Sequence, residues 1–332
     1  MIVDGFRPLS GVHGESTTCR NLLASEGVEL PESMVFGLGS GIGFTYMERC
    51  DRRTGLREPL VLCASKPGGL SENVAGALGM KLIQEETVSR NQARTNLFRR
   101  LDSGKPYGLK LDRFYLDYVE RKAHFSAHYL TACGYDDSYL YLVDVGSDEI
   151  RRSTLQGIEQ ARSTKGFMAS KNLGLYYEPG RMANIEVAIR YSLLKTVSEM
   201  LYGNSTFSGV KGMDKFAERL VAWKRNPNFR YQLLNHYLAW EGQGEARGGF
   251  RLLFSSFLNE ASIMLRNSEL KSAGESFARI AEGWSEIDGL LRQLCAEQDG
   301  LSSRLSEVSK AIRRQSRLEA EAFRMIERAV TC

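Results

Sequence analysis

The chain has 332 residues, of which 42% are hydrophobic and 25% are charged, so it can bury one large core or two ordinary ones. Its 44 Lys and Arg residues nearly balance its 40 Asp and Glu residues, which leaves a formal net charge of +4. No long run of Lys or Arg occurs, so we expect a mixed-charge surface and no nucleic-acid partner.

Neither the cysteines nor the apolar runs indicate a metal centre or a membrane protein. No CxxC pair occurs, which argues against a zinc ribbon or a redox motif, and we predict no metal and no cofactor. The opening MIVDGFRPLSGVHG lacks the apolar core of a signal peptide, and no stretch approaches the ~18 apolar residues of a membrane span. We therefore expect a cytoplasmic protein with reduced thiols and no membrane contact.

The sequence changes character near residue 150. Before it, glycine-rich turns alternate with short apolar runs, and after it long segments show helical periodicity. The pattern predicts an α+β fold with two domains, a mixed domain over residues 1–150 and a helical domain over residues 151–332.

The expected elements follow in chain order. In the first part, we predict helices at 16–24 and 85–101 and strands at 60–64, 107–111, 128–134 and 139–143. Because the turn-like cluster YDDS separates the last two strands, we expect them to form an antiparallel hairpin. In the second part, we predict helices at 183–202, 213–225, 229–240, 249–266, 270–295 and 299–330. The last is amphipathic and could pack within the chain or on a second subunit.

Residues 37–43 read GLGSGIG, which invites a nucleotide-binding interpretation. A dinucleotide fingerprint needs G-x-G-x-x-G, and its last glycine falls on Ile42 in one register and on Phe44 in the other. A P-loop also fails, because no Gly-Lys-Ser/Thr follows. We predict a tight loop whose backbone passes close to a bulky group, either of the fold or of a substrate. In the second case Gly39 and Gly41 are candidate substrate contacts.

The chain has four histidines, and His128 opens a predicted strand whose hairpin partner ends at Asp144. A carboxylate that orients an imidazole is the base half of a Cys-His-Asp site. Taken alone the pair is only moderately specific, since a strand histidine is more often structural and Asp144 could cap a turn. The nucleophile should lie at a helix N-terminus, where the dipole and free N–H groups lower the pKa of a thiol. The helix after His13 is the obvious place.

The segment HGESTTCRNLLASEGVELPESMVFGLGSGIGF resembles the N-terminal signature of the butirosin biosynthesis protein H family. That signature opens with His-Cys-Glu-Thr/Ser, followed by a Leu-rich helix and an SE-x-M-x-FGLGGG-like stretch. Further similar stretches follow in order: LDSGKPYGLKLDRFYLDY, HYLTACGYDD, VKGMDKFAERLVAW and WEGQGEARGGFRLLFSSFLNEA. The resemblance covers nearly the whole chain.

The resemblance implies a papain-like fold followed by a helical domain. The family's founding member transfers an acyl group from an acyl-carrier-protein thioester to an amine of an aminoglycoside. In that pattern a Cys attacks the thioester, a His is the base and an Asp orients the His. His128 and Asp144 match the last two roles, whereas Gly14 stands at the nucleophile position. The implied partners are an acyl-carrier protein or another acyl thioester donor and a small-molecule amine. A homodimer stays open.

No neighbour of Gly14 has the geometry to replace a cysteine there. On an ideal helix Cys19 would lie ~7.5 Å further along the axis and ~140° around it, and Ser16 ~200° around it. Glu15 could cap the helix or bind a substrate amine. His13 could support the helix start or contact the substrate.

Three hypotheses about activity follow. The first is an active transferase without an acyl-enzyme, in which His128 deprotonates the acceptor and the N–H groups of residues 14–16 form an oxyanion hole. The second is another reaction in the same cleft, such as cyclisation or condensation. The third is a catalytically silent partner of a carrier protein or an active paralogue. Asp112, Tyr115 and Arg247 are further candidate substrate contacts, although each could equally belong to a structural turn.

Overall fold

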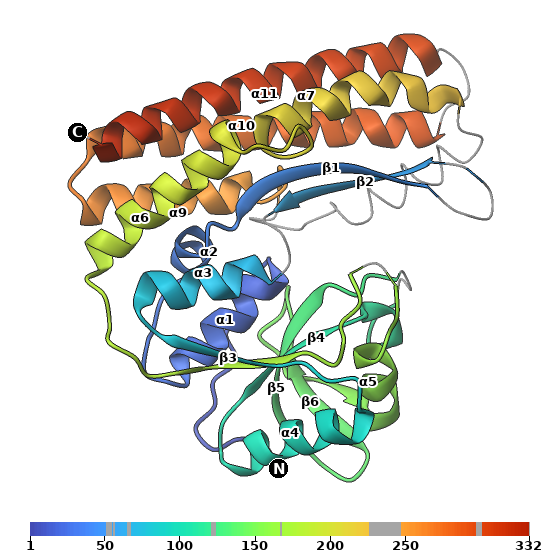
Figure 1. The fold of residues 1–332 in the computed structure, drawn as a ribbon, viewed down its shortest axis with the longest axis vertical. Helices are drawn as coiled ribbons and strands as arrows, with labels where there is room; N and C mark the ends of the chain where they lie inside the picture. Colours follow the sequence, from blue (N-terminus) through green and yellow to red (C-terminus); the bar gives the residue numbers. More distant parts are fainter. Residues whose placement is uncertain are drawn as a thin grey trace. The chain divides into compact units, whose positions relative to one another are not determined.

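The computed structural model describes residues 1–50, 55, 57–64, 68–120, 124–166, 168–225, 247–296 and 301–331. They form two compact units (Figure 1). The sheet unit comprises Met1–Val35 and Pro67–Asn184, and the helical unit comprises Phe36–Lys66 and Ile185–Cys332. The units do not coincide with the predicted division at residue 150. The described residues between 151 and 184 complete the sheet, and those between 36 and 66 group with the C-terminal helices.

The sheet unit is built on a six-stranded sheet of order β3-β8-β4-β5-β6-β7, in which every neighbouring pair is antiparallel. Its strands are β3 (Lys81–Glu85), β4 (Tyr107–Leu111), β5 (His128–Tyr135), β6 (Tyr139–Val143), β7 (Arg151–Thr154) and β8 (Gly174–Glu178). The predicted hairpin is confirmed, with Thr131 opposite Val143 in the β5–β6 register. The unit also contains the helices α1 (Gly14–Ala24), α3 (Gly69–Leu78), α4 (Arg90–Asp102) and α5 (Leu155–Arg162) and the short 3₁₀ helix η1 (Arg113–Tyr115).

Both faces of the central strands are covered. On one face, Leu97 and Leu101 of α4 and Ile158 of α5 join a buried cluster with the strand residues Leu109 and Leu130. On the other face, α1 contacts β4, β5 and β8. Strands that are buried on both faces read as continuous apolar runs, which explains the run YLTACG in β5.

The helix predicted at 85–101 begins later than expected. Residues 81–85 form β3, which pairs with β8, and Ser89 caps α4 by accepting a hydrogen bond from the Gln92 N–H at 3.2 Å. The prediction was wrong at residue 85, which pairs with Gly174 of β8, and the helix begins only after its cap at Ser89.

The helical unit contains a two-stranded hairpin as well as helices. Its elements are β1 (Ile42–Cys50), β2 (Arg57–Ala64), α6 (Ile185–Val197), the π-helical turn η2 (Ser198–Tyr202), α7 (Gly209–Leu220), the 3₁₀ helix η3 (Val221–Arg225), α9 (Arg251–Met264), α10 (Ser268–Ala296) and α11 (Leu301–Thr331). The helix α2 (Glu32–Leu38) spans the boundary between the units. The helix predicted at 229–240 lies outside the described residues. The α+β class is confirmed, and α11 packs along α10, α7 and α6 of its own chain.

A buried ion pair fastens the hairpin to the helices of this unit. Arg251 and Glu319 are both fully buried, and the Arg251 guanidinium donates to both Glu319 oxygens at 2.8 and 3.1 Å. It also donates to the carbonyls of Cys63 at 2.8 Å and Gly43 at 3.2 Å, which lie in the hairpin strands. Trp284 donates to the same Glu319 carboxylate at 2.6 Å. Because the charges are paired and hydrogen-bonded, the core can hold them.

The glycine-rich segment 37–43 is not one loop, since Gly37 lies in α2 and β1 begins at Ile42. A Cβ on Gly37 would lie 2.1–2.3 Å from ring atoms of Phe257, and a Cβ on Gly41 would lie 2.5–2.6 Å from ring atoms of Phe36. The bulky groups that approach this backbone are therefore side chains of the fold itself. No helix in the described ranges combines the length and the apolar character that crossing a membrane requires.

Candidate functional site

His128 and Asp144 lie together in the sheet unit, where β5 begins and β6 ends. His128 Nε2 lies 2.8 Å from Asp144 Oδ1. An ionised carboxylate can only accept hydrogen bonds, so Nε2 carries the proton and donates it. When the imidazole is neutral, its lone pair is therefore on Nδ1, the nitrogen that a general base would use.

Asp144 is held by two further donors. The Tyr118 hydroxyl donates to Oδ2 at 2.7 Å, and the Val145 N–H donates to Oδ1 at 2.8 Å. Burial alone would raise the pKa of Asp144, but the charge and hydrogen bonds of His128, Tyr118 and Val145 hold that pKa below its usual range. The carboxylate thus stays ionised and fixes the orientation of the imidazole.

The free nitrogen of His128 faces position 14. A Cβ built on Gly14 would lie 3.8 Å from His128 Nδ1, 3.0 Å from the Tyr129 carbonyl oxygen and 3.4 Å from the Tyr129 nitrogen. A side chain at position 14 would thus start beside the base. The start of α1 also passes so close to β5 that a Cβ would press on the Tyr129 backbone.

The loop before α1 is fixed by Glu32, a buried residue at the start of α2. Its carboxylate accepts the N–H groups of Val12 and His13, each at 2.9 Å, and the hydroxyls of Ser16 at 2.8 Å and Thr17 at 3.0 Å. His13 is the N-cap of α1 and accepts the Ser16 N–H on Nδ1 at 3.2 Å. These bonds place the first turn of α1 beside β5.

Among the N–H groups of residues 14–16, the candidates for an oxyanion hole, some already have an acceptor and others do not. The Ser16 N–H is taken by His13, and the Thr17 N–H donates to the His13 carbonyl at 2.9 Å. The N–H groups of Gly14 and Glu15 precede the first intrahelical bond, and no acceptor for them lies among the described residues. Two adjacent donors therefore remain at the positive end of the helix dipole, where a Cβ on Gly14 would lie 3.8 Å from His128 Nδ1.

Neither Ser16 nor Cys19 can act as the nucleophile in this arrangement. The Ser16 hydroxyl is fully buried and donates to Glu32. Cys19 is also fully buried, with its sulfur 3.2 Å from the Tyr177 hydroxyl, and burial, reinforced by the charge of Glu15, raises the pKa of its thiol. A buried thiol with a raised pKa is inert.

Glu15 points away from the base and caps a different helix. Its carboxylate accepts the N–H of Gly68 at 2.9 Å and both the N–H and the hydroxyl of Ser71, at 2.8 and 2.9 Å. These groups lie at the start of α3. Burial raises the pKa of Glu15, against the effect of the hydrogen bonds. This placement favours capping, the structural alternative, over binding of a substrate amine.

Residues 13–145 match the family model described as butirosin biosynthesis protein H, N-terminal. By this match, residues 13–145 of the chain belong to the butirosin biosynthesis protein H family. The matched range includes His13, Gly14, His128 and Asp144. Residues 156–326 match a second model, described as a domain of unknown function (DUF4872). A search of curated proteins finds no match.

Within this family member, Asp112 and Tyr115 occupy structural positions of the sheet unit. Asp112 is buried and accepts the N–H groups of Phe114 and Phe125, the Ser126 hydroxyl and His124 Nδ1, at 3.0–3.1 Å. Tyr115 packs against the apolar core and makes edge contacts with Phe114 and His124. The arrangement favours the turn interpretation for both.

Gly39, Gly41 and Arg247 belong to the helical unit, whereas His128 and Asp144 belong to the sheet unit. Arg247 is exposed and lines a small pocket with Cys63, Trp284 and Asp288. The candidate substrate contacts thus fall into two separate units, and their role stays a prediction.

Tyr118 and Glu32 were missed by the sequence analysis. Tyr118 lies in the family-like stretch LDRFYLDY, but nothing in its spacing points to Asp144. Glu32 follows a proline at the start of a helix, which is typical of an ordinary first-turn acid. The signal for both is three-dimensional: each contacts residues far along the chain.

Proposed function

We propose that this protein forms amides by transferring an acyl group from a carrier-protein thioester, or a related activated donor, to a small-molecule amine in the biosynthesis of an antibiotic-type metabolite. His128 serves as the general base, Asp144 orients it, and no covalent acyl-enzyme forms. One observation carries this proposal: the free Nδ1 of a carboxylate-oriented imidazole lies beside the open start of α1.

In the proposed reaction the acceptor amine attacks the thioester carbonyl. His128 Nδ1 takes the proton that the attacking nitrogen loses. The N–H groups of Gly14 and Glu15 donate to the oxygen that becomes negative. The C–S bond then breaks, and the proton passes from His128 to the departing thiolate, which restores the neutral imidazole.

A thioester is an activated donor, so this route does not require a covalent intermediate. Positioned general-base help contributes typically ~10²–10⁴-fold, which suits a thioester better than an unactivated amide. Membership of a family named after the biosynthesis of butirosin supports a carrier-bound acyl donor and an amine acceptor.

The test is to incubate the protein with acyl-carrier protein charged with different acyl groups, or with acyl-pantetheine thioesters, and a panel of amines, and to detect amides by mass spectrometry. His128→Ala should abolish the product. His124→Ala is the matched control, because His124 is mostly exposed and contacts Asp112 rather than Asp144. Full activity of His128→Ala would refute the proposed base.

A second variant tests whether the rest of the site suits a nucleophile. Gly14→Cys requires the Tyr129 carbonyl to yield by a few tenths of an ångström, since the added Cβ would lie 3.0 Å from it. We expect this variant to form a covalent acyl adduct with an acyl thioester.

A catalytically silent binding partner is the second candidate function. It is favoured by the burial of Ser16 and Cys19, the two candidate nucleophiles that follow Gly14 in α1. Carrier-protein binding without turnover in the wild type would support it. Formation of a product from a single bound substrate would instead indicate cyclisation or condensation.

A further inference from the structure

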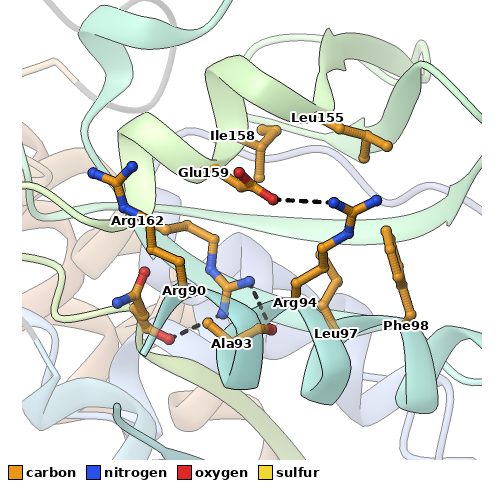
Figure 2. A pocket seen from close by; sticks show the side chains of 10 residues that line it. Arg90, Ala93, Arg94, Leu97, Phe98, Leu155, Ile158, Glu159 and Arg162 are labelled. Carbon is orange, nitrogen blue, oxygen red and sulfur yellow. Dashed lines mark hydrogen bonds and ion pairs between the residues drawn. The ribbon is translucent and has the colours of Figure 1, made fainter. Parts of the chain in front are cut away.

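A pocket of the sheet unit lies between α4 and α5, and none of its lining residues holds His128 or Asp144. Figure 2 shows side chains of the two helices facing each other across it. α4 contributes Arg90 and Arg94, and α5 contributes Glu159 and Arg162. Three arginines against one glutamate leave two positive charges at this pocket.

Arg162 is the unusual member, because its side chain is buried and incompletely paired. Only 3% of the surface of Arg162 is exposed to solvent. Nη1 donates to the Ala93 carbonyl at 3.1 Å and Nη2 to the Asn172 carbonyl at 2.9 Å, but the buried Nε has no hydrogen-bond partner. No carboxylate oxygen in the described part of the chain lies within 4 Å of this guanidinium. Burial accordingly lowers the pKa of Arg162 to about 10.

The other charges do not neutralise Arg162. Glu159 pairs with Arg94 at 3.5 Å, and both side chains are well exposed (37% and 53%). Arg90 is exposed, and no ion pair of its side chain occurs in the described ranges. The charges of Glu85 and Glu159 act on Arg162 without forming an ion pair with it. A buried donor without an acceptor is unfavourable, and an anion that reaches Nε would relieve this condition.

The pocket also has an apolar wall. Leu97 and Phe98 of α4 face Leu155 and Ile158 of α5. Arg94 lies over the Phe98 ring, with its guanidinium carbon 5.3 Å from the ring centroid. A ligand here meets cationic donors on one side and aliphatic and aromatic carbon on the other.

We propose that this pocket binds a small phosphorylated or carboxylated molecule whose anionic group reaches the arginines and whose short apolar part lies on the wall. Phosphate and carboxylate oxygens suit the planar fork of donors that a guanidinium presents. This binding is separate from the proposed acyl transfer, and neither requires the other.

The probes are inorganic phosphate, n-butyl phosphate and butyrate, titrated into the full-length protein at constant ionic strength set by NaCl. Binding is followed by calorimetry and by the Nε–H resonances of the arginine side chains in NMR spectra. We expect n-butyl phosphate to bind about tenfold more tightly than phosphate, because part of its chain leaves water. The Arg162 Nε–H resonance should shift as the site fills. Butyrate shows whether a carboxylate suffices.

Variants assign the binding to the pocket. Arg90→Gln and Arg94→Gln should each weaken n-butyl phosphate binding about tenfold. Glu159→Gln should strengthen the binding of n-butyl phosphate, because the substitution removes a negative charge from the pocket. Arg99→Gln is the matched control on the same helix, since Arg99 is exposed, pairs with Glu85 and does not line the pocket.

The proposal does not rest on Arg162→Met, a variant that could unfold the protein. It is overturned if no probe binds above the NaCl control or if the Arg162 Nε–H resonance stays unmoved at saturation. It is equally overturned if Arg90→Gln and Arg99→Gln bind n-butyl phosphate alike. None of these measurements involves a carrier protein or an amine, so failure here leaves the proposed transferase function untouched.

Discussion

Acidification should destabilise the protein through His13, and an asparagine at that position should remove this effect. His13 caps α1 by accepting the Ser16 N–H on Nδ1, which it can do only while Nδ1 is unprotonated. Burial, helped by the nearby charge of His128, lowers the pKa of His13 from 6.5 to about 4. Asn is also a good N-cap, and its side-chain oxygen accepts the same N–H without titrating.

The sign follows from which state binds the proton. Above pH 6.5 His13 is neutral in both the folded and the unfolded chain, so it adds no pH dependence. Between pH 6.5 and about 4 only the unfolded chain becomes protonated there, and the free energy of unfolding falls as the pH falls. At ~1.4 kcal/mol for each tenfold difference, the loss is at most about 3 kcal/mol by pH 4.

Urea denaturation of wild type and His13→Asn between pH 7.5 and 4.5 measures this effect. Glu15 has a raised pKa and acts in the opposite direction, so the difference between the two proteins is the informative quantity. The difference should be small at pH 7.5 and should favour His13→Asn increasingly toward pH 4.5. Parallel pH curves for the two proteins would refute the proposed role of His13.

Two further predictions concern the hydrogen bond from Tyr118 to Asp144 and the packing of glycines in helices. Tyr118→Phe removes a donor from the buried carboxylate of Asp144, which should cost ~1–3 kcal/mol of stability and raise the pKa of Asp144. Its acid-induced loss of stability, measured by denaturation against pH, should then be smaller and end at higher pH, because the pKa of Asp144 in the folded protein lies closer to its unfolded value. Gly37→Ala should cost ~1–3 kcal/mol because the new methyl group meets the Phe257 ring. Gly76→Ala, on an exposed and open helical site, should stabilise by ~0.5–1 kcal/mol.

The outcomes that contradict these predictions are distinct. An unchanged acid limb in Tyr118→Phe would mean that the hydroxyl does not sustain the ionisation of Asp144. Equal thermal midpoints for Gly37→Ala and Gly76→Ala would mean that the ring of Phe257 moves away at no cost.

The strands that could be predicted are those whose signal is local. Residues 107–111 and 139–143 are short apolar runs between turns, and the structure has strands there with the same bounds. β3 and β7, with the sequences KLIQE and RRST, carry charged and polar side chains and lack that pattern. They are strands because β8 and β6 supply their hydrogen-bond partners.

In the candidate site, too, some residues could be predicted from local sequence and others could not. His128 and Asp144 could be paired from the sequence because a short turn joins their strands and brings both residues to one end of the hairpin. The roles of Glu32 and Tyr118 depend on contacts between elements that no local pattern connects. The burial of Arg251 against Glu319 could not be predicted either, since the sequence presents each as an ordinary charge in a helix.

The machinery around Gly14 is positioned without any side chain at that residue. Asp144 fixes the imidazole of His128, while Glu32 and His13 fix the first turn of α1. Gly14 therefore offers no attacking atom, while the proposed base His128 and the two proposed N–H donors are held by other residues. Because no side chain of residue 14 is needed to position these groups, we can propose that the acceptor amine itself attacks the thioester in this site. It also makes the acyl adduct of Gly14→Cys a test of the geometry of the site, because the variant adds a thiol beside His128 and requires only a small shift of the Tyr129 carbonyl.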